Sequence, residues 1–288
     1  MAQELTNTQQ LRDLSVQHHR RGDTLTAQGQ YAGALDAYQT ALAIVQRLLT
    51  RQPHHVDWQQ ELAVSHERIG DSLAALERHE EALASYRSGL TVREQLAARC
   101  PTYLPWQRDV AILYNRVGDS LLVLGQGEAA LNAYHDGLRM IEQLVAAEPD
   151  PIEQQWDLSI SYNRIGDAYV KMGLGMDALI AYRAGLEIRE RLAERHGDNT
   201  VLQTDLVVSY WKIARINMDI RDDTAETAAI LSLGLALLQR LQQEARLTPE
   251  QEGWIGAFQQ ALGELRQPHG LRGKARSIWH KLSLWSWR

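Results

Sequence analysis

The sequence predicts an all-α solenoid, in which antiparallel helix pairs stack one after another. The dipeptide Gly-Asp recurs at a fixed interval of 48 residues, and the residues around each copy also match. A fixed period of this length is typical of one supersecondary unit that is repeated and stacked. Within each copy the apolar residues have helical spacing, and no alternation of the kind found in β-strands persists. The four dipeptides are Gly22-Asp23, Gly70-Asp71, Gly118-Asp119 and Gly166-Asp167.

The first helix of each predicted pair contains the Gly-Asp dipeptide. In the second copy Leu62, His66, Ile69 and Leu73 lie three or four residues apart, which is the apolar stripe of an amphipathic helix. The glycine of the dipeptide marks a place where this helix needs a close approach to its partner. We therefore predict that the glycine is a packing position.

The second helix of each pair follows a short turn. Its apolar stripe includes an alanine and, four residues later, a tyrosine, which we predict to be a core residue. The turn contains glycine in three copies, a residue type that ends helices in the left-handed conformation. The second copy has Glu77 there and must turn without glycine. The tyrosines are Tyr38, Tyr86, Tyr134 and Tyr182, and the turn glycines are Gly29, Gly125 and Gly173.

Polar or proline-containing loops separate the copies, because proline ends the second helix. The fifth copy departs from the pattern, since Ala214-Arg215 stands where Gly-Asp would recur. Thr248-Pro249-Glu250 then has the residue types of a helix start, so we expect a capping helix over residues 248–266. A basic, Trp-rich tail occupies residues 267–288. The copies predicted within residues 1–247 cover about 10–57, 58–105, 106–153, 154–201 and 202–247.

This pattern resembles the tetratricopeptide repeat. An aromatic residue or a histidine precedes the glycine by four residues, and an alanine follows it by twelve. The third copy has Tyr114, Gly118, Ala130, Tyr134 and Gly137 at the characteristic positions. The usual repeat has about 34 residues, so the longer copies here are similar to those of kinesin light chain and of many bacterial repeat proteins. The resemblance implies a right-handed superhelix, whose first helices line a concave groove that contacts peptide ligands.

Composition argues against several classes of function. The net charge is -6, and residues 266–288 hold six basic residues and no acid. The rest of the chain is therefore acidic, with 24 basic and 36 acidic residues, which does not suit general binding of nucleic acid. We find no metal-ligand, nucleotide or catalytic motif, and we expect a protein that is not an enzyme and needs no cofactor or metal. The single cysteine, Cys100, and the lack of an apolar leader lead us to expect a cytoplasmic protein.

A ladder of polar residues recurs on the first helices. A cation lies two residues before the glycine, an acid lies one residue after it, and asparagine lies three residues before it in two copies. Arginine presents a fork of donors that suits carboxylates, and asparagine can both donate and accept along a peptide backbone. We therefore predict that the ladder contacts a protein or peptide partner. The alternative is structural, because an arginine of one copy can pair with an aspartate of the next. The candidate residues are Arg20, Arg68, Arg116, Arg164, Lys212, Asn115, Asn163, Asp71, Asp119 and Asp167.

The tail offers a second candidate site, formed by Trp279, Lys281, Trp285 and Trp287. Basic segments with tryptophan bind well to anionic membrane surfaces, so the tail could dock to a membrane or to a protein partner. The alternative is a last helix that folds over the end of the stack and buries its tryptophans.

These observations together predict a scaffold or adaptor that binds a peptide or a partner helix in the groove. Two other functions stay open at this point. The chain could be a peripheral membrane or assembly component that the tail targets, or the regulatory subunit of an enzyme on another chain.

Overall fold

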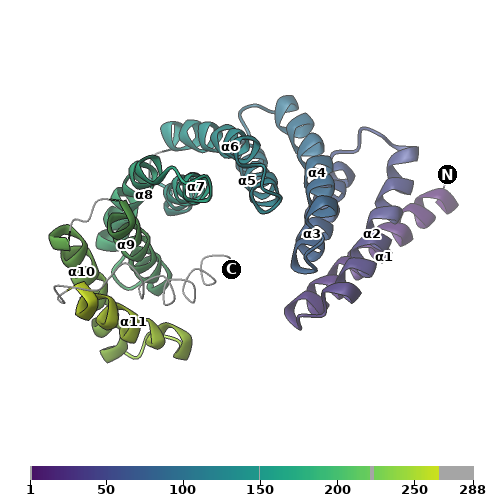
Figure 1. The fold of residues 1–288 in the computed structure, drawn as a ribbon. Helices are drawn as coiled ribbons and strands as arrows, with labels where there is room; N and C mark the ends of the chain where they lie inside the picture. Colours follow the sequence, from purple (N-terminus) through teal and green to yellow (C-terminus); the bar gives the residue numbers. More distant parts are fainter. Residues whose placement is uncertain (1, 149, 221–223, 266–288) are drawn as a thin grey trace. The chain divides into compact units, whose positions relative to one another are not determined.

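The computed structural model describes residues 2–148, 150–220 and 224–265. All regular structure in these ranges is helical, and the helices pack in consecutive pairs, which confirms the predicted fold class (Figure 1). The first helix begins at Ala2, earlier than the predicted start of the first copy near residue 10. The helices are α1 (Ala2–Ala27), α2 (Tyr31–Arg51), α3 (Val56–Ala75), α4 (His79–Arg99), α5 (Leu104–Val123), α6 (Gly127–Ala147), α7 (Ile152–Lys171), α8 (Gly175–Arg195), α9 (Thr200–Ile220), α10 (Thr224–Gln243) and α11 (Pro249–Leu265).

The chain forms two compact units, Met1–Glu148 and Pro149–Arg288. The N-terminal unit contains α1–α6, and α7–α11 belong to the C-terminal unit. Within each unit, helices of one pair make the most extensive contacts, and the second helix of a pair also packs on the first helix of the next. In the described ranges we find no helix that is both long and apolar enough to cross a membrane.

The turns inside the pairs have the left-handed backbone that the glycines indicated. Gly29, Gly125 and Gly173 have φ angles of 71°, 75° and 75°. Glu77 adopts the same conformation with φ 60°, so the second copy makes the same turn with a residue that disfavours it. The amide of Gln30 donates to the carbonyl of Leu25 at 2.9 Å, which closes the first of these helix ends.

The glycine of each Gly-Asp dipeptide receives the tyrosine ring of its partner helix. A Cβ atom at Gly118 would lie 2.4 Å from Cε1 of Tyr134, which is fully buried. The equivalent distance between Gly70 and Tyr86 is 2.5 Å. No Cβ atom can approach a ring so closely, and the glycine therefore allows the two helices to pack at this point.

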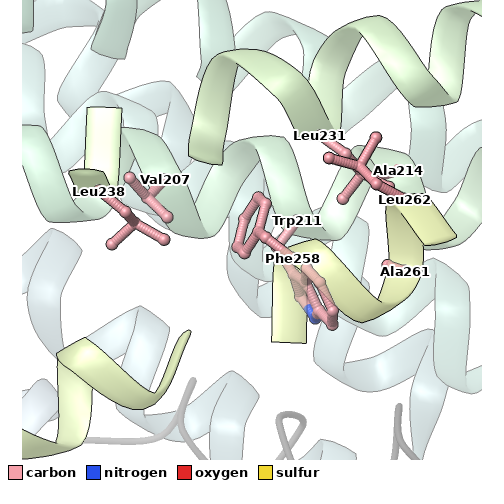
Figure 2. Packing of buried hydrophobic residues seen from close by; sticks show 8 residues of the cluster. All are labelled: Val207, Trp211, Ala214, Leu231, Leu238, Phe258, Ala261 and Leu262. Carbon is pink, nitrogen blue, oxygen red and sulfur yellow. The ribbon is translucent and has the colours of Figure 1, made fainter. Parts of the chain in front are cut away.

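In the C-terminal unit, α11 covers the apolar face of α9 and α10. Figure 2 shows the ring of Phe258 beside Trp211, with ring centroids 4.8 Å apart. A Cβ atom at Gly234 of α10 would lie 2.4 Å from Cε1 of Phe258, so a ring and a glycine again meet. The cluster consists of Val207, Trp211, Ala214, Leu231, Leu238, Phe258, Ala261 and Leu262.

Candidate interaction surface

In the N-terminal unit the ladder forms ion pairs between successive copies. The Tyr86 hydroxyl donates to Oδ1 of Asp71 at 2.8 Å, and the Arg116 Nε atom of the next copy lies 3.6 Å from the same oxygen. Arg68 and Asp23 repeat this contact at 3.6 Å. The arginines are about half exposed and the contacts are long, so each ion pair contributes little to stability.

The tyrosine hydroxyls hold the aspartates in place on the first helices. Burial, followed by the charge of Asp71, raises the pKa of Tyr86, and burial, followed by the charge of Asp167, raises the pKa of Tyr182. Both hydroxyls therefore stay protonated at neutral pH and donate to the carboxylates. The Gly-Asp dipeptide thus makes two contacts with one tyrosine, because the glycine packs on its ring and the aspartate accepts its hydrogen bond.

The last step of the ladder, in the C-terminal unit, is buried. The Nζ atom of Lys212 donates to both carboxylate oxygens of Asp167 at 2.8 and 2.7 Å and lies 5.4 Å from the centroid of the Tyr182 ring. Burial lowers the pKa of Lys212, and the charge of Asp167 opposes this shift. Arg215 takes the place of a further aspartate, and its charge also lowers the pKa of Lys212. This step is a structural contact, because the lysine is hardly accessible to a partner.

The asparagines lie between the two helices of a pair. Asn115 is buried, and its Oδ1 atom, which makes no hydrogen bond in the described residues, lies 3.4 Å from the place of a Cβ atom at Gly137. The Oδ1 atom of Asn163 lies 3.1 Å from the equivalent point at Gly185. Both side chains thus face the second helix of their own pair.

The other candidates differ in their exposure, and some of them lie outside the residues that the structure describes. Arg20 is exposed on α1, Arg164 is half-buried on α7, and Asp119 accepts the Tyr134 hydroxyl at 2.8 Å. The four tail candidates lie outside the described residues. Of the predicted groove residues, Arg68 and Arg116 combine exposure with a well-defined neighbour.

Sequence reasoning missed two buried arginines. Arg93 lies between Glu67 of α3, at 2.9 Å, and Asp109 of α5, at 2.8 Å. Burial raises the pKa of Glu67 and of Asp109, and the charge of Arg93 opposes both shifts. The first and third copies have the apolar residues Val45 and Ile141 at the same register position. The sequence signal for Arg93 was therefore a cation at a position that is apolar in other copies.

The second of these arginines is Arg189, which follows Arg93 by two copies. It donates to the hydroxyls of Ser159 and Ser209 at 3.1 and 2.8 Å and to the carbonyl of Asp205 at 3.1 Å. Where Val45 stands instead, the Oε2 atom of Glu61 in the following helix is buried and makes no hydrogen bond in the described residues. The arginine thus satisfies polar groups at the junction of two copies.

Apolar side chains flank the ladder on the first helices, which sequence reasoning also missed. On α5, Ile112, Arg116, Asp119 and Val123 have the spacing i, i+4, i+7 and i+11, so they share one face of the helix. Ile112 is 37% exposed and Val123 is 50% exposed. The signal was present in the sequence, because a β-branched apolar residue precedes each glycine by six residues. In the N-terminal unit these residues are Val16, Val64 and Ile112.

We call this face of α1, α3 and α5 the ladder face. It combines the exposed apolar side chains of α5 with charges that already neutralise one another. Such a surface can bind a partner that is partly apolar, and hydrogen bonds from the arginines can fix the orientation of that partner. Among the described residues no group of three or more metal-ligating side chains occurs.

Comparisons with known proteins agree with this architecture. Residues 13–88 match the family model of the tetratricopeptide repeat, and no curated protein matches the sequence. The apo form of RapI has a TM-score of 0.67 at 11% identity, over 94% of this chain and 83% of its own. Aspartyl phosphate phosphatase F from Bacillus subtilis has a TM-score of 0.67 at 13% identity, over 98% of this chain and 62% of its own. The Rap conjugation gene regulator of plasmid pLS20, solved with the Phr* peptide, has a TM-score of 0.55 at 14% identity, over 93% and 62%.

At these identities the solved structures show the fold alone, whereas the family match rests on the sequence of the first two copies. The same glycine–tyrosine–aspartate contacts recur in the later copies, outside the matched residues. Residues 13–88 thus match the tetratricopeptide repeat, and the later copies share the packing of these residues.

Proposed function

We propose that this chain is a non-enzymatic scaffold that binds a peptide or a partner helix along the ladder face. The observation that carries the proposal is the exposure of Ile112 and Val123 on either side of Arg116. Folding alone gives no reason to leave two large β-branched side chains exposed on one face of a helix, and such residues contribute to binding when a partner covers them.

The charges of the ladder face support the same proposal. In the ion pairs to Asp23 and Asp71, the Nε atoms of Arg68 and Arg116 lie at the long distance of 3.6 Å. A guanidinium group has five N–H donors, so each arginine can keep this contact and also donate to a carbonyl or carboxylate of a partner. A partner therefore gains orientation without having to break the ladder.

The pLS20 regulator was solved with a bound peptide, which supports peptide binding by a fold of this kind. We expect the partner of this chain to contribute apolar side chains at the positions that cover Ile112 and Val123. An acidic or basic peptide without apolar residues should bind poorly, because the ladder carries no excess charge in the N-terminal unit.

A comparison of two full-length variants tests the proposal. Tagged wild-type chain and the variant Ile112→Gln/Val123→Gln are used to capture partners from source cells, and mass spectrometry quantifies the captured proteins. The control, Val201→Gln/Leu233→Gln, changes two residues that are more exposed and lie on α9 and α10. We then expect the ladder-face variant to bind an identified partner about tenfold more weakly by calorimetry, since about 1.4 kcal/mol of apolar burial is lost. Equal capture by all three folded chains would contradict the proposal.

A further inference from the structure

The fourth copy exposes apolar residues where the other copies are polar or small. Leu174, Met176 and Ile180, at the start of α8, are 42%, 48% and 66% exposed. The equivalents of Leu174 are Gln30, Arg78 and Gln126, those of Met176 are Ala32, Glu80 and Glu128, and those of Ile180 are Asp36, Ala84 and Asn132. The repeat fold does not require apolar residues at these places, because three other copies fold without them.

A fourth exposed apolar residue, Ile220 at the end of α9, packs against the start of α8 at Gly175. Its Cγ2 atom is 2.6 Å from the place of a Cβ atom at Gly175, which lies between Leu174 and Met176 in the chain. Met176 and Ile180 are one turn apart on the same side of α8. We call these four side chains the α8 patch. Single exposed apolar residues are common, but a cluster of this kind marks an interaction site.

Charged residues border the α8 patch. Asp177 follows Met176, and Asp219 precedes Ile220. Arg183 pairs with Glu226 of α10 one turn beyond Ile180, so these two charges balance each other. Lys171, at the end of α7, supplies one further cation. The surroundings are slightly acidic and can accept a basic apolar segment.

We propose that the chain's own C-terminal segment, residues 267–288, binds the α8 patch. The sequence of this segment supplies both properties that the patch requires. It contains large apolar residues, among them Trp279, Leu282 and Trp285, and its charged residues are all basic. The rest of the chain has 36 acidic and 25 basic residues, so charge also favours the contact.

The segment can reach the patch within one chain. It follows α11, which belongs to the same compact unit as α8. The twelve residues from 266 to 277 can span up to about 40 Å, whereas a helix of 20 residues is about 30 Å long. A tethered segment also has an effective concentration in the millimolar range, so a weak contact suffices to occupy the patch.

Two full-length variants test the two sides of this contact. Leu174→Gln/Met176→Gln/Ile180→Asn makes the patch polar without changing its charge, and Trp279→Ser/Trp285→Ser/Trp287→Ser removes the apolar residues of the segment. Trypsin cleavage at Lys274, Arg276 and Lys281 reports access to the segment, and hydrogen exchange at residues 174–180 reports cover of the patch. Val201→Gln/Leu233→Gln is the matched control.

We expect either triple variant to speed cleavage at the three sites about tenfold and to speed exchange at residues 174–180, at every protein concentration. The control should behave like the wild type. Protection that grows with concentration, together with a doubled mass in light scattering, would assign the contact to a second copy and overturn the proposal. Unchanged cleavage in the patch variant, with the segment bound to phosphatidylserine vesicles, would overturn it in favour of a membrane. Partner capture through the ladder face is a separate measurement, so either proposal can fail without the other.

Discussion

The contact between glycine and tyrosine gives a prediction whose magnitude follows from the structure. Gly118→Ala adds a Cβ atom 2.4 Å from the ring of Tyr134, which is fully buried and cannot move aside without disturbing the core. Overpacking of this kind costs about 1–3 kcal/mol. A displaced ring also weakens the hydrogen bond from Tyr134 to Asp119, and hydrogen bonds to charged groups contribute about 1.5–3 kcal/mol.

Alanine favours a helix over glycine by about 1 kcal/mol, which offsets part of this cost. We therefore expect Gly118→Ala to lower the free energy of unfolding of the N-terminal unit by about 2–4 kcal/mol. Gly33→Ala is the matched control, because Gly33 is an exposed helical glycine whose Cβ atom would lie 3.4 Å from Leu25, an ordinary contact. The control should stabilise the same unit by about 0.5–1 kcal/mol.

Urea unfolding followed by circular dichroism measures both variants, and hydrogen exchange of α5 and α6 locates the effect. Repeat arrays can unfold in parts, so the exchange data decide whether the lost stability belongs to this helix pair. The reasoning fails if the two glycines respond alike, since both substitutions have the same effect on helix propensity and differ in the ring contact.

Three further predictions concern single positions. Glu77→Gly should raise the free energy of unfolding by about 1 kcal/mol in urea titrations, because glycine adopts the φ of 60° without strain, while Gly125→Ala should lower it by a similar amount. Burial raises the pKa of Glu67 above its ordinary value of 4.5, so the folded chain holds a proton that the unfolded chain releases, and stability falls as the pH rises from about 4.5 through the folded pKa. Glu67→Gln should flatten this decline in unfolding curves measured between pH 4.5 and 7.5, and an unchanged slope would assign it to other groups. Asp167→Asn leaves the buried ammonium of Lys212 without its counter-charge and should cost about 3–5 kcal/mol in thermal or urea unfolding, whereas Lys212→Met should cost much less, and equal losses would contradict this account.

The fold could be predicted from the sequence because each copy has the same spacing of the residues that pack the two helices together. The spacing of Gly70, Ala82 and Tyr86 recurs in four copies, and the structure places this tyrosine ring on this glycine. The turn at Glu77 could also be predicted, since a turn of fixed length between two fixed helices leaves one backbone conformation. Residues that agree among the copies therefore identify the positions that the fold requires for packing.

The candidate surface was harder to predict, because it depends on what lies around each residue. Asn115 has the chemistry of a backbone-binding residue, yet its position relative to Gly137 buries it between two helices. Arg93 and Met176 stand at positions where the copies differ from one another, and a comparison that seeks agreement among the copies passes over such positions. The ladder pairs Arg116 with Asp71 as the structural alternative required, and whether a partner also binds there stays a prediction.

The buried arginines have a consequence for how this array can be lengthened or shortened. Arg93 and Arg189 occur in alternate copies, with Val45 and Ile141 at the same place in the others. Each arginine satisfies polar groups of the following helix, and the Oε2 atom of Glu61, which follows Val45, lacks this contact. Every copy has an acid at the place of Asp109, namely Asp13, Glu61, Asp157 or Asp205, so an arginine at the place of Arg93 would meet an acid in whichever copy follows it. An engineered array based on this chain can therefore repeat a copy that carries the arginine, and each junction would then pair a buried cation with an acid.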